Sequence, residues 1–179
     1  MAGSLVQVDT FTVSSAVASV IIGGGSSGSS STNFAINTDD VYMLTISNYQ
    51  PVTDNTNFRL RVTVSGTADS SSNYDYTGKF LANPNFFNHN SQGQAQFQGE
   101  GLGTATGEVG NHIMYLYNFN NSSEYSFITV MGSSRDASGN QLGFQGAISN
   151  EVTQACDGIQ LSQSSGNIAS GTVTLYKVV

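Results

Sequence analysis

The side chains that most often carry catalysis or metal binding are few in this sequence and lie in unrelated contexts. Neither His89 nor His112 belongs to a spacing such as HExxH, which would place two metal ligands on one face of a helix. Cys156 is the only cysteine, which excludes an internal disulfide and a thiolate metal cluster. We therefore expect His89 to be a solvated loop residue, His112 to begin a strand, and Cys156 to be a small, partly buried hydrophobic residue.

The acidic residues are dispersed among turn-rich segments, where an Asp side chain usually accepts hydrogen bonds from the backbone. Two of them would form a glycosidase dyad only if folding brought their carboxyl groups to within about 5 to 10 Å of each other. Oxygen ligands for Ca²⁺ are conceivable at Asp39-Asp40 or in the loop from Asp69 to Asp75, but the EF-hand pattern is missing.

The sequence also gives no support for nucleotide binding. We expect no nucleophile elbow, and the Gly-rich runs lack the Lys and the following helix of a phosphate-binding loop. We expect no catalytic residue, no metal site and no cofactor, and therefore a protein that is not an enzyme. A carbohydrate-active enzyme is the alternative, disfavoured by the sparse carboxylates and the absence of Trp.

Charge excludes further classes of partner. Only 9% of the 179 residues are charged, and the net charge is -7. The cations are scattered, at Arg59, Arg61, Lys79, Arg135 and Lys177. Because binding to a phosphate backbone depends on clustered Lys and Arg, we expect no nucleic-acid partner. Apolar runs such as Val20 to Ile22 are far too short to span a bilayer, so we expect no membrane partner either.

The hydrophobic pattern has a period of two, which is typical of half-buried strands, and no helical series persists beyond one turn. Strands are expected at 5–13, 16–22, 41–47, 58–65, 74–81, 112–119, 125–131, 142–148, 159–163 and 172–178. Residues 112–119 and 125–131 should form a hairpin, and residues 159–163 and 172–178 a second one that closes the protein. About nine or ten strands without a helix predict an all-β, antiparallel, jelly-roll-like sandwich in a single domain, residues 1–179.

Two segments do not fit the strand pattern. Residues 23–32 consist mainly of Gly and Ser and predict a flexible loop. Residues 83–110 contain few β-branched residues and predict a long loop excursion from the sandwich. Within it, Phe86 and Phe87 need a place to be buried, either on a neighbouring subunit or on the chain's own sandwich. The candidate residues for a subunit or capsid interface are Phe86, Phe87, Phe97, Tyr74 and Tyr76.

The last 23 residues, from Asp157 to Val179, carry a resemblance to a known family. The strand Gly158-Ile159-Gln160-Leu161, the run SGNIASG and the ending Thr174-Leu175-Tyr176 resemble the C-terminal signature of small virion domains in tailed bacteriophages. The segment 48–57 with the strand after it, and Leu116-Tyr117-Asn118, resemble the same family less closely. Lys177 departs from the pattern, since such proteins commonly have Gly there, and residues 83–110 have no counterpart.

This resemblance implies a non-enzymatic virion structural protein with a jelly-roll fold, assembled in the cytoplasm of a bacterial host. The expected role is a capsid decoration (cement) protein on the outer surface of the head. Its expected partners are itself, as a homo-oligomer with a trimer favoured, and the major capsid protein or another virion protein. The alternative is a tail-fibre tip whose amide-rich loops and exposed aromatic residues bind host surface glycans.

Overall fold

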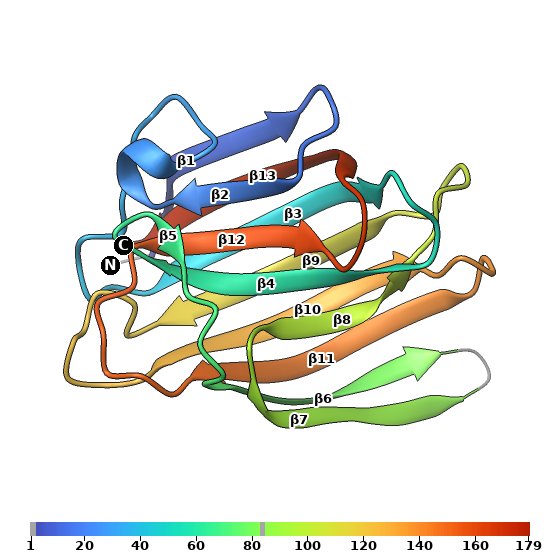
Figure 1. Ribbon diagram of the computed structural model, residues 1–179. Helices are drawn as coiled ribbons and strands as arrows, with labels where there is room; N and C mark the ends of the chain where they lie inside the picture. Colours follow the sequence, from blue (N-terminus) through green and yellow to red (C-terminus); the bar gives the residue numbers. More distant parts are fainter. Residues whose placement is uncertain (1–2, 83–84) are drawn as a thin grey trace.

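The computed structural model describes residues 3–82 and 85–179, which fold into two antiparallel β-sheets packed face to face (Figure 1). In the larger sheet, eight strands follow the order β1-β13-β3-β9-β10-β11-β6-β7. Their bounds are β1 Leu5–Val13, β13 Ile168–Val178, β3 Tyr42–Pro51, β9 Gly110–Tyr117, β10 Ser126–Arg135, β11 Gln141–Asn150, β6 Tyr74–Ala82 and β7 Phe86–Gln94. The predicted all-β antiparallel sandwich is confirmed, with more strands than the nine or ten expected.

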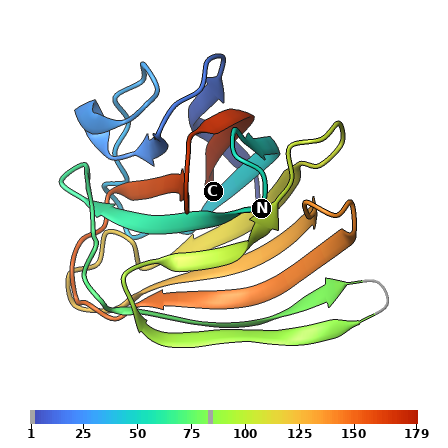
Figure 2. The same ribbon diagram turned by 45° about the vertical axis from the view of Figure 1, so that its right-hand side comes forward.

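The smaller sheet contains five strands in the described part of the chain and covers only part of the larger one (Figure 2). They are β2 Ser19–Gly23, β12 Gly158–Gln163, β4 Thr56–Val64, β5 Thr67–Ala68 and β8 Phe97–Leu102. β4 lies beside β12 on one edge, while β5 and β8 share its other edge. β6 and β7 therefore lie largely beyond the smaller sheet, which reaches β6 through β8 and through a hydrogen bond from the Val62 N–H of β4 to the Tyr74 hydroxyl.

Alternation of apolar and polar residues directs one face of each sheet into a common core. In β4 the inward residues Phe58, Leu60 and Val62 are buried between the sheets, and Leu44 and Ile46 of β3 come from the opposite layer. Burial of these aliphatic and aromatic side chains stabilises the fold by about 1.5 to 3 kcal/mol for each fully buried residue. The period-two pattern of the sequence thus fixes which face of each strand is available to solvent.

The predicted hairpin at the C-terminus is wrong. β12 belongs to the smaller sheet, where it pairs with β2 and β4, whereas β13 belongs to the larger sheet and pairs with β1 and β3. Leu161 and Leu175 are both buried, because the two strands face each other across the core. Alternation reveals a buried face but not the sheet to which a strand belongs. The hairpin of β9 with β10 is confirmed by a continuous register from Phe127–Tyr117 to Ser134–Gly110.

The prediction of a loop excursion at 83–110 is also wrong for the residues that the structure describes. β7 and β8 occupy residues 86–94 and 97–102, and residues 83–84 lie outside the described residues. The tight connection between them carries the chain from the larger sheet to the smaller one (Figure 1). In this segment, aromatic side chains at alternate positions cover the face that points toward the core. β-branched side chains more often fill such positions in a strand.

That inner face holds a cluster of aromatic rings, formed by Tyr76, Phe80, Phe87, His89, Phe97 and Phe144. Phe97 of β8 meets Tyr76 edge to face, with the ring centroids 5.2 Å apart. The Phe144 ring lies over the paired glycines Gly78 and Gly146, where an added Cβ would come within 2.8 Å and 2.6 Å of it. Edge-to-face and offset pairs of this kind stabilise a core beyond their buried area. The two glycines therefore make the space that the cluster requires.

The Gly/Ser segment 23–32 is fastened by one buried carboxylate. Asp9 is 1% exposed and accepts hydrogen bonds from the backbone N–H of Gly23 (2.8 Å) and from the hydroxyl of Thr32 (2.6 Å). The Ser30 hydroxyl donates to the same carboxylate, and residues 25–27 form a short 3-10 helix, η1 (Gly25–Ser27). The segment predicted as a flexible loop is therefore anchored at both ends to β1.

Replacing Asp9 by Ala should lower the free energy of unfolding by roughly 2 to 4 kcal/mol, because it leaves the buried Gly23 N–H and the loop hydroxyls without an acceptor. Urea unfolding followed by circular dichroism measures the loss. Thr12→Ala is the matched control, since Thr12 is exposed on the same strand and bonds only to the Thr172 hydroxyl. Equal stability of the two variants would contradict the anchoring role of Asp9.

Candidate functional site

The outer face of the larger sheet is open to solvent in the described part of the chain. The ladder register aligns outward side chains in rows across β9, β10, β11, β6 and β7. One row reads Ile113, Met131, Gln145, Lys79 and Asn88, and the next reads Tyr115, Thr129, Ala147, Thr77 and Asn90. Apart from Lys79 these are neutral side chains, so the face combines apolar groups with amides and hydroxyls.

Large apolar side chains are unusually exposed on this face. Ile113, Phe127 and Met131 are 43%, 45% and 51% exposed, and Leu81 and Phe86 are 56% and 69% exposed near the open end of the sheet. Lys79 places its ammonium group 5.2 Å from the centroid of the Phe86 ring, a cation–π contact. Exposed apolar side chains gathered on one face typically mark an interaction surface.

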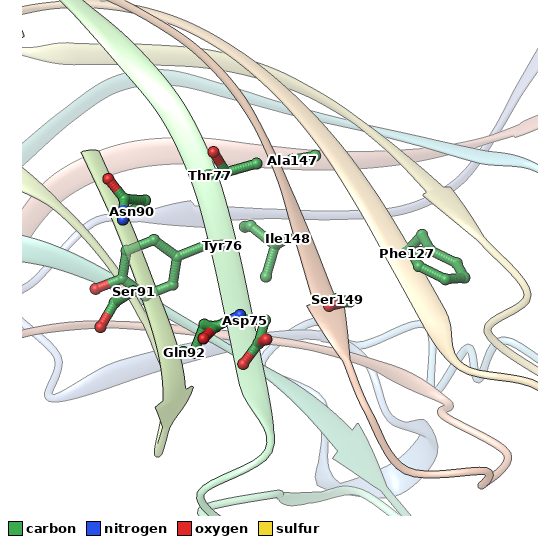
Figure 3. Close-up of a pocket in the computed structure, with 10 residues that line it drawn as sticks. All are labelled: Asp75, Tyr76, Thr77, Asn90, Ser91, Gln92, Phe127, Ala147, Ile148 and Ser149. Carbon is green, nitrogen blue, oxygen red and sulfur yellow. The ribbon is translucent and has the colours of Figure 1, made fainter. Parts of the chain in front are cut away.

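A groove of about 570 Å³ crosses this face over β10, β11, β6 and β7 (Figure 3). Phe127 forms one wall, and Asn90 and Gln92 of β7 form the other. Small side chains, Ala147 and Thr77, lie between the walls, with Asp75 and Ser149 at one end. The groove therefore offers one aromatic face, two amides and one carboxylate to a ligand.

A second hollow of about 450 Å³ continues from this groove along β6 and β7. It shares Thr77 and Asn90 with the groove and adds Lys79, Asn88 and Gln145. Together the two hollows form a trough along the two last strands of the sheet. The sequence pattern did not identify this trough, because its residues are polar and come from strands distant in sequence.

The residues predicted for an interface occupy different environments. Phe86 and Phe87 are exposed, although Phe87 also stacks on Phe80 with ring centroids 5.3 Å apart. Tyr74 and Phe97 are buried in the chain's own core, at 0% and 2% exposure. Tyr76 is half-buried, packs against the core and also lines the groove. Phe86 and Phe87 lie on opposite faces of β7, Phe86 on the outer face with Lys79 and Phe87 on the inner face against Phe80.

The acidic residues considered as Ca²⁺ ligands serve as acceptors within the fold. Asp40 forms an ion pair with Lys177 at 2.6 Å, and Asp39 accepts from the Asn121 amide. Burial tends to raise the pKa of Asp69, but hydrogen bonds from Ser71, Gln154 and Asn150 outweigh it and lower that pKa. Within residues 3–82 and 85–179, no three His, Cys, Asp or Glu side chains gather as a metal site.

His89 is not the solvated loop residue that was expected. It lies in β7, stacks on Tyr76 with centroids 5.1 Å apart, and places Nε2 2.6 Å from the carbonyl oxygen of Gln98. This contact joins β7 to β8. The aromatic packing and the backbone contact together give His89 a structural role in the cluster.

Cys156 is fully buried in the connection between β11 and β12, where the Ser126 hydroxyl lies 3.4 Å from its sulfur. Burial raises the pKa of the Cys156 thiol to about 11. A thiol protonated at neutral pH and closed off from solvent is a poor nucleophile. The prediction of a buried hydrophobic role is consistent with this environment.

His112 is the most unusual titratable group in the described residues. Its ring stacks on Phe58 at 5.0 Å and points into the core, where neither ring nitrogen has a hydrogen-bond partner among the described residues. An added Cβ on the opposite residue, Gly132, would lie 2.4 Å from its Nδ1, so only Gly leaves room for the ring. Burial lowers the pKa of His112 to about 4, and Glu100 and Ser134 line the small cavity of about 20 Å³ beside it.

Comparison with known proteins gives no relative from which a site could be transferred: no family model, curated protein or solved structure matches this chain. Within the part of the chain that the structure describes, no helix has the length and apolarity needed to cross a membrane.

Acid should destabilise the protein through His112. Its folded pKa of about 4 lies below the ordinary 6.5, so the unfolded chain binds more protons below pH 6.5. The contribution is complete above pH 6.5 and is lost as the pH falls from 6.5 to 4, amounting to as much as about 3 kcal/mol. Urea unfolding at pH 7 and pH 4.5 should show a smaller loss in His112→Phe than in the wild type. Identical losses would contradict this assignment.

Proposed function

We propose that this protein is a non-enzymatic structural protein of a bacteriophage virion, a decoration protein that sits on the outside of the capsid as a symmetric homo-oligomer. The observation that carries the proposal is the outer face of the larger sheet, where Ile113, Phe127 and Met131 are exposed together. Its partners are further copies of the chain and the major capsid protein. Assembly takes place in the host cytoplasm.

The chemistry of the surface supports attachment to protein rather than to nucleic acid. The net charge is -7, and Lys79 is the one cation in the aligned rows of the outer face. Protein interfaces are depleted of charge at their centre and rich in aromatic residues and Met, as this face is. Copies linked in a closed oligomer would attach with higher avidity than a single sandwich.

A second function, binding of a host surface glycan at a tail-fibre tip, is favoured by the groove alone. Sugar rings present hydroxyl groups and a weakly apolar face, and the groove offers the amides of Asn90 and Gln92 opposite the ring of Phe127. Both functions use the same face of the sheet. They differ in the position and copy number of the protein in the particle.

Quantitative gel densitometry with cryo-electron microscopy of purified particles should find hundreds of copies spread over the head. A few copies at the tail would favour the glycan-binding function, and absence from particles would overturn both.

Attachment to particles that lack the protein should weaken at least tenfold when Phe127 and Met131 are both replaced by Ser, because buried aromatic and Met anchors dominate interface energetics. Co-sedimentation of the purified variant with such particles measures this. Tyr125→Ser is the matched control, since Tyr125 is 43% exposed on the same hairpin but outside the groove. Equal attachment of the two variants would remove the outer face from the proposal.

Glycan binding has its own test. Isothermal titration calorimetry with oligosaccharides from the host surface should show binding to the wild type. The double variant Asn90→Ala with Gln92→Ala should bind more weakly. Thr129→Ala should bind like the wild type, since Thr129 is exposed on the same face outside the groove. Absence of binding by the wild type would exclude this second function for the glycans tested.

A further inference from the structure

An open sheet edge exposes unpaired backbone groups, and proteins usually protect such edges with short strands, charges, prolines or bulges. Four edge strands in the described part of the chain follow this rule. β2 and β5 are five and two residues long, and β8 carries Glu100. β1, at one end of the larger sheet, has a bulge between Gln7 and Asp9.

β7, at the other end of the larger sheet, has almost none of these devices. Its nine residues, FFNHNSQGQ, include no charged residue and no Pro, and seven of them are exposed. Among the residues that the structure describes, β7 pairs with β6 and with no other strand. Its register with β6 is regular from Phe86 to Ser91 and shifts only beyond Ser91. This leaves a regular, uncharged edge of six residues.

The direction of the backbone groups on this edge follows from the pairing of Ala82 with Asn85. The N–H of Ala82 donates to the carbonyl oxygen of Asn85 at 2.7 Å, so this is a hydrogen-bonded pair. Hydrogen-bonded and non-hydrogen-bonded pairs alternate along an antiparallel ladder. Phe86, Asn88 and Asn90 therefore turn their N–H and C=O groups away from β6, toward the open edge.

We propose that this edge pairs with the same edge of a second copy of the chain, antiparallel and centred on Asn88. Asn88 then faces Asn88 of the second copy, and Phe86 faces Asn90 at both ends. The three pairs satisfy all six open backbone groups of each copy. The two larger sheets then become one continuous sheet. On the inner side Phe87, which is 42% exposed, meets His89 of the second copy.

Charge and chemistry favour a second copy as the occupant. Two chains that each carry a net charge of -7 repel each other, so an interface between copies needs a neutral surface, and β7 is one. The amides of Asn88 and Asn90 both donate and accept hydrogen bonds, which makes the strand complementary to itself. The contact is isologous and closes as a dimer.

The pairing also extends the groove. Asn90 and Gln92 form the groove wall on β7, so the dimer brings the grooves of two copies onto one sheet, on either side of the two-fold axis. The inference rests on the homo-oligomer in the proposed function but not on the particle. A chain that fails to dimerise in solution could still be found on the head.

Sedimentation equilibrium of the purified chain should give twice the 18.8 kDa of one copy. Asn88→Glu with Asn90→Glu places four carboxylates across the two-fold axis and should weaken dimerisation at least tenfold, while Thr129→Glu, on the same face far from the edge, leaves it unchanged. Circular dichroism establishes that each variant is folded. A monomeric or trimeric wild type, or a dimer unaffected by the double substitution, would overturn the proposal.

A disulfide tests the register directly. Residues in a hydrogen-bonded antiparallel pair have Cα atoms about 5.5 Å apart, within the range that a disulfide bridges. Asn88→Cys should therefore form a covalent dimer under mild oxidation, seen on a non-reducing gel, whereas Thr129→Cys should not. Cys156 is buried and does not compete. Equal cross-linking of the two variants, or of neither, would reject the pairing centred on Asn88.

Discussion

The inequality of the two sheets is the constraint on which the rest of this structure depends. Eight strands face five, so β6 and β7 cannot bury their inner surface against a matching layer. Aromatic rings solve the problem, because a single ring covers more area than an aliphatic side chain. Phe97, delivered by β8, reaches the rings of Tyr76 and Phe144, and the glycine pair Gly78–Gly146 lets them lie close to the sheet. At the far end of the larger sheet, contact with the smaller sheet is thus made mainly through a few aromatic rings.

This solution determines what the surface can do. Since the aromatic residues at alternate positions of β7 point inward, the intervening Asn and Gln residues must point outward, where they form the trough. The same strand ends the sheet, so its backbone is available along one side. β7 therefore carries both the polar side chains of the trough and an open backbone edge. This strand links the groove, the apolar face and self-association to one region of the molecule.

Much of the fold was predictable from the sequence, and the failures have physical reasons. The strand Thr56–Val64 follows from alternation, because its residues Phe58, Leu60 and Val62 are buried on one face. Alternation does not assign a strand to a sheet, which is why β12 and β13 were mistaken for a hairpin. β7 was missed because strand propensity reflects β-branched residues, and it has none. The site was the least predictable part: Phe86 was identified by its apolarity, whereas Asn90 and Gln92 gain meaning only from their neighbours across the ladder.

The single buried thiol gives this protein a natural reporter of its own motions. Cys156 lies where the chain passes from β11 in one sheet to β12 in the other, and its backbone N–H donates to the carbonyl oxygen of Phe119 at the end of a third segment. A thiol reagent can reach it only when this crossing opens. The rate of modification therefore measures how often the chain opens at this crossing, and it can be followed in the isolated chain, in an assembly or on a particle without introducing a label.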